Sequence, residues 1–135
     1  MKRFDSDQLR EECGVFGISD HIDASALVAL GLHALQHRGQ EGCGIVSFDG
    51  KNYHSEKRQG LVGDHFTNSE TLKKLPGRFA IGHNRYSTTG ETSLRNIQPF
   101  FADLHMGGLS IAHNGHLTNA LLLRENLVQN GAIFR

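Results

Sequence analysis

Cys13 is the residue whose type and setting best suit nucleophilic chemistry. It opens an apolar run, residues 13–18, that predicts a short buried strand, and it follows a polar segment, residues 1–12, without apolar periodicity. A free cysteine usually behaves as a small buried apolar side chain. The glycines at positions 14 and 17 nevertheless leave room for another group to approach the backbone. Both alternatives, a core residue and a nucleophile, therefore stay open.

Arg85 is the second candidate, because its surroundings could bind an anion. It stands near the polar end of a strand predicted for residues 78–86, which begins apolar, and the hydroxyl residues Ser87, Thr88 and Thr89 follow directly. A guanidinium can bind a carboxylate through two parallel hydrogen bonds, and neighbouring hydroxyls can donate to the same anion. The alternative is a solvated arginine beside a polar surface turn.

Two glycine-containing turns carry further polar groups. Residues 36–46 combine a guanidinium, a carboxylate and amides with three glycines, and they run into an apolar strand. The pair Asn114-Gly115 lies between a short strand, residues 109–112, and a helical pattern, residues 117–130. Such a pair can direct a side-chain amide and a backbone N–H at one point, as an oxyanion hole does, but it also commonly just turns the chain. Neither turn decides between function and scaffold by itself.

The elements between these motifs must position them. Apolar residues of the segment 24–38 lie nearly all round a helix, which predicts a largely buried helix. The pair Asp49-Gly50 favours a tight hairpin turn. The other expectations are strands at 44–49 and 51–58, a capping box at Thr67 and Glu70 that begins a short helix to Leu75, a loop over 91–107 with an apolar anchor at 98–101, and a helix end at Gly131.

Length and composition limit the class of protein. A chain of 135 residues suits one domain. Its 14 Lys and Arg balance its 14 Asp and Glu, which argues against a nucleic-acid-binding surface. No apolar run approaches the roughly 20 residues of a membrane-spanning helix, and residues 1–12 are too polar and acidic for a secretory signal. We therefore expect a cytoplasmic protein with neither a nucleic acid nor a membrane as partner.

Metal chemistry has little support in the sequence. Cys13 and Cys43 show no zinc-binding spacing and are expected to remain thiols in a reducing compartment. His33 and His37 stand four residues apart on the predicted helix, but no acidic or cysteine partner lies at a usable spacing. We expect no metal in this segment.

The order of four motifs resembles one family. They are Cys-Gly-x-Phe-Gly, Leu-Gln-His-Arg-Gly-Gln-Glu, Gly-His-x-Arg-Tyr and Ala-His-Asn-Gly-x-Leu-x-Asn-Ala. Over residues 13–135 the chain is similar to the N-terminal glutaminase domain of the amidophosphoribosyltransferases, the class II glutamine amidotransferases that open purine biosynthesis. The second and third motifs favour this family over the glucosamine-phosphate synthase, asparagine synthetase and glutamate synthase relatives. The resemblance implies an α+β fold, the N-terminal-nucleophile hydrolase αββα sandwich of antiparallel sheets.

The resemblance also implies a role for individual residues. Cys13 would become the N-terminus after removal of a propeptide, residues 1–12, and would attack the side-chain amide of L-glutamine. Asn114 and Gly115 would form the oxyanion hole, and Arg85 would hold the substrate α-carboxylate. Further contacts to the substrate or the nucleophile are expected from Thr88, Arg38 and Gly39.

By the same resemblance, the fold should be incomplete at its C-terminus. In the family, an aspartate that holds the substrate α-amino group, the rest of the glutaminase domain and a phosphoribosyltransferase domain follow the position of Arg135. Phosphoribosyl pyrophosphate, Mg²⁺ and any iron–sulfur cluster are expected in that distal part, and a homo-oligomer is expected at full length. The segment alone is expected to be inactive. The alternatives are another class II amidotransferase and a truncated, non-catalytic fragment.

Overall fold

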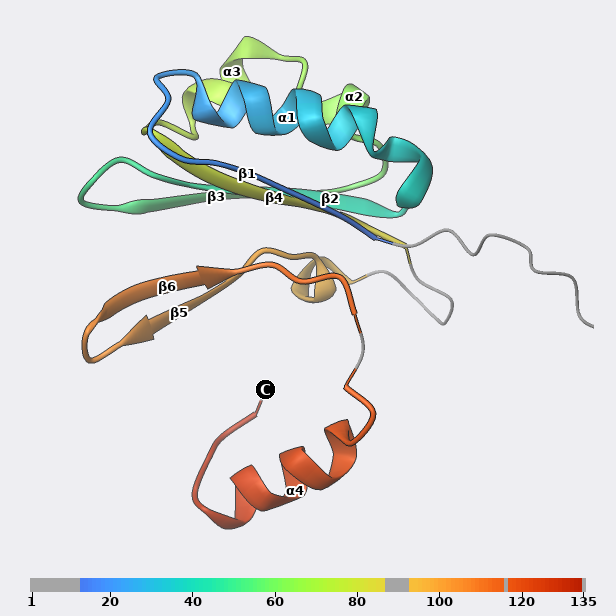
Figure 1. Ribbon diagram of the computed structural model, residues 1–135, viewed down its shortest axis with the longest axis vertical. Helices are drawn as coiled ribbons and strands as arrows, with labels where there is room; N and C mark the ends of the chain where they lie inside the picture. The colour runs from blue at the N-terminus through green and yellow to red at the C-terminus, as the bar shows by residue number, and fades with distance from the viewer. Residues whose placement is uncertain (1–12, 87–92, 116, 135) are drawn as a thin grey trace, which may run out of the picture.

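A computed structural model of the chain describes residues 13–86, 93–115 and 117–134, and it shows a mixed α+β architecture (Figure 1). Predicted strands and helices are confirmed at residues 13–18, 24–38, 44–58, 78–86, 109–112 and 117–130, with boundaries shifted by a few residues. The elements are β1 (Gly14–Ile18), α1 (Ala24–Ala34), η1 (Gln36–Arg38), β2 (Gly42–Phe48), β3 (Tyr53–Gln59), α2 (Val62–His65), α3 (Ser69–Lys73), β4 (Phe79–Arg85), η2 (Leu94–Asn96), β5 (Phe100–Leu104), β6 (Gly107–Ile111) and α4 (Ala120–Gln129).

Four antiparallel strands form the main sheet in the order β1-β4-β2-β3. β4 is a central strand, so its two neighbours fix it from both sides. Gly14 of β1 lies opposite Asn84, and Gly42 of β2 lies opposite Arg85. Because both registers are set at the same end of β4, the residue that precedes β1 comes to lie beside the end of β4.

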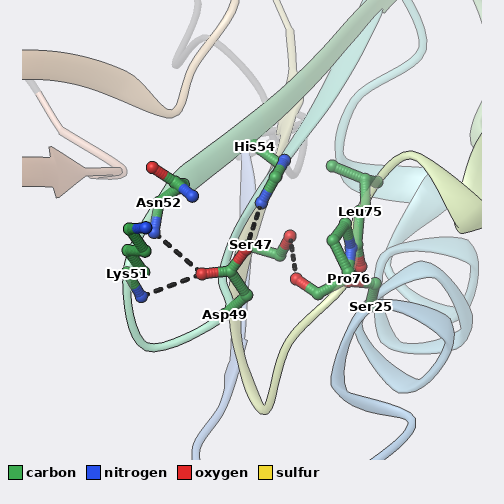
Figure 2. Close-up of polar contacts among 8 residues, drawn as sticks. All are labelled: Ser25, Ser47, Asp49, Lys51, Asn52, His54, Leu75 and Pro76. Atoms are coloured by element: carbon green, nitrogen blue, oxygen red, sulfur yellow. Dashed lines mark hydrogen bonds and ion pairs between the residues drawn. The ribbon is translucent and has the colours of Figure 1, made fainter.

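Helices α1, α2 and α3 cover one face of this sheet (Figure 1). The core lies between α1 and the sheet, as expected for a helix that is apolar nearly all round. Two buried hydroxyls fasten the segment after α3 to this core: Ser25 donates to the carbonyl of Leu75 at 2.7 Å, and Ser47 to that of Pro76 at 2.8 Å (Figure 2). Core residues include Ala24, Val28, Ala29, Leu32, Cys43, Ile45, Val62, Phe66, Leu75 and Ala80.

The turn between β2 and β3 is organised by one carboxylate. Asp49 accepts hydrogen bonds from the backbone N–H groups of Lys51 and Asn52, each at 2.8 Å, and pairs with His54 at 2.7 Å (Figure 2). The Asn52 N–H is the largest of the influences that lower the pKa of Asp49 to about 2. Gly50 has φ +96°, which confirms the predicted tight turn.

The other face of the sheet is opposed by the two-stranded hairpin β5–β6, and α4 lies beyond that hairpin (Figure 1). The layers therefore follow the order helix, sheet, sheet, helix, and the predicted α+β class is confirmed. No residue of α4 is buried, and Leu121 is 78% exposed. The helix ends as predicted at Gly131, whose φ is +91° and whose N–H donates to Val128.

Two sequence-based expectations were wrong. Residues 91–107 were predicted to form a loop, but they contain η2 and β5, because cross-strand pairing with β6 supplies a partner that local periodicity does not reveal. The anchor of this segment includes Ile97, which is fully buried. The predicted capping box is also absent: Asn68 caps α3 by accepting from the Glu70 N–H, and Thr67 donates to Gly63.

Glycines on β2 allow the chain after η2 to cross directly over the main sheet. A Cβ at Gly44 would lie 2.2 Å from the carbonyl oxygen of Gln98, and one at Gly42 would lie 2.7 Å from the side chain of Ile97. Gly44 has no unusual φ, so the close approach alone excludes a side chain there. The crossing sets the position of β5, β6 and the loop that follows them.

We expect Gly44→Ala to lower the free energy of unfolding by roughly 1–3 kcal/mol, because a backbone carbonyl must move to admit the methyl group. Gly17→Ala is the matched control, since its added Cβ would lie at an ordinary 3.4 Å from Ile81. The control should change stability by no more than about 0.5 kcal/mol. Urea unfolding followed by circular dichroism compares the two. Equal effects would contradict the proposed crossing.

Candidate active site

Cys13 lies at the entry to β1, beside the end of β4. The backbone N–H of Tyr86 donates to the Cys13 sulfur at 3.3 Å, and the thiol lies 3.6 Å from the Tyr86 carbonyl oxygen. Tyr86 follows the last residue of β4, so its N–H is directed at the sulfur and not into the strand ladder. Cys13 is only partly buried and is therefore accessible to a reactant.

The backbone carbonyl of Cys13 is held by two side chains from different parts of the fold. Arg38 Nε, from η1, donates to it at 3.2 Å, and Asn114 Nδ2, from the loop after β6, donates at 2.5 Å. These residues are 25 and 101 positions from Cys13 in the sequence. The structure thus brings together Cys13, Arg38 and Asn114, three of the residues singled out in the sequence.

Gly39 brings the turn that carries Arg38 against the end of β4. A Cβ at this position would lie 2.8 to 2.9 Å from backbone atoms of Asn84 and Arg85. The φ of Gly39 is −163°, which any residue can adopt, so contact and not conformation requires glycine. The neighbouring Gln36 side chain accepts from the Val62 N–H at 2.8 Å and donates to the Gly39 carbonyl, which holds the turn.

The exposed Asn114 side chain contacts Cys13, and the exposed Gly115 follows it in the chain. A side-chain amide nitrogen carries two N–H groups. One of those on Asn114 binds the Cys13 carbonyl, which fixes the orientation of the amide plane. A Cβ at Gly115 would meet no atom within 4 Å, so its backbone is open to a ligand. Held in this way, the pair could stabilise the negative oxygen that forms when the sulfur attacks a carbonyl group.

Arg85 lies at the same strand end, but its guanidinium is engaged by the protein. Nη1 donates to the carbonyl of Asn96 at 2.6 Å, while Nε is buried and has no hydrogen-bond partner. The Arg85 guanidinium therefore contacts the Asn96 carbonyl and not Cys13. To bind a carboxylate, Nη1 would have to give up its hydrogen bond to Asn96. Thr88, the other predicted carboxylate contact, lies outside the described residues.

A buried polar group lies behind the Asn114 loop. His83, on the sheet face that opposes the hairpin, is 1% exposed, and neither ring nitrogen has a hydrogen-bond partner. Burial, followed by the positive charge of His113, lowers the pKa of His83 to about 4. Gln98 accepts from the His113 N–H at 2.7 Å, so the two segments above His83 are joined.

Cys43 provides a contrast to Cys13. It is completely buried in the core between α1 and the sheet, and desolvation raises its pKa to about 12. A thiol in that state is not a nucleophile at neutral pH. The two cysteines are therefore separated by environment, because one lies at the strand end and the other within β2.

The described residues offer no group of three or more histidine, cysteine or acidic side chains that could hold a metal ion. His33 and His37 are not part of any such group. None of the described helices is both long and apolar enough to pass through a bilayer.

Sequence reasoning did not identify the roles of Tyr86, His83 and Gln98. Tyr86 acts through its backbone N–H, which every residue but proline possesses, so no residue pattern could have indicated it. His83 carried a usable signal, because it is a histidine that directly follows the apolar first half of β4. Gln98 was noted only within the apolar anchor, whereas its side chain joins that anchor to the loop that bears Asn114.

No protein-family model matches the chain. The amidophosphoribosyltransferase of Rhizobium etli is 64% identical over 129 residues, which are 96% of this chain and 26% of that relative. The chain thus spans about a quarter of the length of this curated relative.

Two solved structures show the same fold. One, described as the allosteric regulatory enzyme of purine biosynthesis, has a TM-score of 0.83 and 47% identity. The other is glutamine phosphoribosylpyrophosphate amidotransferase from Bacillus subtilis in complex with ADP and GMP, with a TM-score of 0.80 and 45% identity. Each match covers 90% of this chain and 26% of the solved one. The chain belongs to the amidophosphoribosyltransferase family and corresponds to the N-terminal region of its members.

Proposed function

We propose that this chain is the glutaminase part of an amidophosphoribosyltransferase, in which Cys13 releases ammonia from L-glutamine. The observation that carries the proposal is the convergence on Cys13 of three groups from separate elements. Tyr86 donates to its sulfur, while Arg38 and Asn114 donate to its carbonyl. A buried structural cysteine such as Cys43 has no such arrangement, and structural cysteines do not need one.

In the proposed reaction the Cys13 sulfur attacks the carbonyl carbon of the glutamine side-chain amide. The negative charge that develops on the oxygen is stabilised by the second N–H of Asn114 and the backbone N–H of Gly115. The proton of the thiol passes to the base and then to the departing ammonia, which leaves a γ-glutamyl thioester. Water next attacks this thioester, and glutamate and the free thiol are formed.

The α-amine of Cys13 is the proposed base. A thiol of pKa about 8.5 is only a few per cent ionised at neutral pH, whereas an α-amine of pKa about 7.7–8.0 is partly neutral and can take its proton. While Glu12 remains attached, this nitrogen is an amide and cannot act as a base. Removal of residues 1–12 as a propeptide would therefore switch the enzyme on.

The remaining roles concern the substrate. Arg85 would hold the α-carboxylate of glutamine after its Nη1 leaves the Asn96 carbonyl, with Thr88 as a further contact. Arg38 and Gly39 would shape the pocket next to the nucleophile. An Arg85 Nε that is buried without a partner supports the proposal, since a bound carboxylate would supply one.

The activity of the whole protein is part of the same proposal. The ammonia would convert phosphoribosyl pyrophosphate into phosphoribosylamine at a distal domain, where Mg²⁺ and any iron–sulfur cluster would also bind. We further propose a cytoplasmic homo-oligomer with this N-terminal-nucleophile hydrolase domain. The names of the relatives favour this acceptor over those of other class II amidotransferases.

We expect Cys13→Ser in the full-length protein to abolish glutaminase activity and labelling by a glutamine-analogue electrophile, because a serine hydroxyl is a far weaker nucleophile. Cys43→Ser is the matched control and should keep both, since Cys43 is buried with a pKa raised to about 12. Peptide mass spectrometry locates the label. Label on Cys43, or full activity of Cys13→Ser, would refute the assignment.

The leader is tested separately. A variant whose residues 1–12 cannot be removed should have glutaminase activity at least about 100-fold below that of the mature protein, because its Cys13 nitrogen is an amide and general-base catalysis contributes about 10²–10⁴-fold. N-terminal sequencing of the active natural protein should begin at Cys13. An active preparation that begins at Met1 would contradict the maturation step.

Asn114 and Arg85 should affect different kinetic constants. Asn114→Ala removes an oxyanion donor and is expected to lower kcat by roughly 10²–10³-fold. Arg85→Gln removes a contact made in both the ground state and the transition state, so it should mainly raise KM for glutamine. Steady-state glutaminase kinetics of the two variants distinguish these outcomes. If Asn114→Ala raised only KM, the oxyanion assignment would be wrong.

A further inference from the structure

A buried histidine behind the active centre has no role in the reaction described above. Among the described residues, the buried side-chain atoms without a hydrogen-bond partner all belong to three successive residues of β4: His83, Asn84 and Arg85. A buried polar group without a partner destabilises a fold, so an apolar ring would be more stable at position 83. The position of His83 therefore calls for a functional explanation.

The alternation of side chains along β4 gives the direction of His83. Ala80 packs in the core with α1, a Cβ at Gly82 would meet Leu32, and Asn84 donates to the Leu32 carbonyl at 2.7 Å. Even-numbered residues of β4 therefore face α1. His83 faces the opposite layer, which carries the loop with Asn114.

The segment that follows η2 crosses the sheet close to His83. Gly44 lies directly opposite His83 in the register of β2 and β4, and the Gln98 backbone crosses at that glycine. The Gln98 side chain in turn accepts from the His113 N–H at 2.7 Å. Burial lowers the pKa of His83, and His113 lies close enough for its charge to lower that pKa further. The His83 side chain thus faces the layer in which the Gln98–His113 hydrogen bond leads to Asn114.

We propose that His83 is a positioning residue for the oxyanion donors: its imidazole supports the Gln98–His113 contact and so holds Asn114 and Gly115 in place beside the Cys13 sulfur. The inference rests on the proposed glutaminase function. His83 touches neither the sulfur nor, in this role, the substrate. Its ring stays neutral at physiological pH, because burial and the neighbouring positive groups oppose protonation.

The test compares His83→Phe with His83→Gln in the mature full-length protein. Phenylalanine fills the space of the ring without its nitrogens, whereas glutamine keeps a polar group that can reach the same backbone. For His83→Phe we expect kcat per active site to fall by roughly 10–100-fold with KM for glutamine within about twofold, since small displacements of a catalytic group have effects of this size. Its melting temperature should be unchanged or higher, and His83→Gln should recover part of kcat.

Active sites are counted by stoichiometric labelling of Cys13 with the glutamine-analogue electrophile, so that misfolded protein does not affect kcat. An unchanged kcat per labelled site in His83→Phe would overturn the proposal. If His83→Phe does not fold, His83→Leu, which also lacks the ring nitrogens, takes its place: a lower kcat with unchanged KM supports the proposal, and wild-type kcat overturns it. Failure of the proposed function itself would look different, because the unaltered protein would then lack glutaminase activity and Cys13 labelling.

Discussion

The candidate site depends on how the start of β1 is held against the end of β4. Gly14 pairs with Asn84, so Cys13 comes to lie beside the residues that follow β4 and its sulfur meets the Tyr86 N–H. The Cys13 carbonyl then becomes the point at which Arg38 and Asn114 meet. A strand register, which is a property of the backbone, thereby assembles side chains that are far apart in the sequence.

The two layers of the fold contribute different parts of the site. The main sheet and its helices provide Cys13, Arg38 and the strand end, while the chain that returns through η2, β5 and β6 provides Asn114 and Gly115. Gly42 and Gly44 allow this second layer to approach the first, and the Gln98–His113 hydrogen bond links the crossing to the loop. Asn114 and Gly115, the proposed oxyanion donors, are thus positioned by contacts between the layers, and the buried His83 lies at this boundary.

Much of the scaffold could be predicted from local patterns. Apolar periodicity indicated α1 and β4, Asp49-Gly50 indicated the hairpin, and Gly131 indicated the end of α4. The β5 strand was missed because its pairing with β6 is not encoded in the periodicity of either strand. The capping box was wrong because the Asn68 side chain reached the Glu70 N–H, while Thr67 was engaged by Gly63.

The candidate site could be predicted only as a set of ambiguous motifs. The residue types indicated Cys13, Asn114 and Arg85 as candidates. Only the packing of the fold shows that Asn114 contacts Cys13 and that Arg85 binds the Asn96 carbonyl. The most direct measurement is a crystal structure of the mature protein with a glutamine-analogue electrophile bound covalently. The account predicts an adduct on Cys13 whose oxygen accepts hydrogen bonds from Asn114 Nδ2 and the Gly115 N–H. An adduct whose oxygen points away from both donors would contradict it.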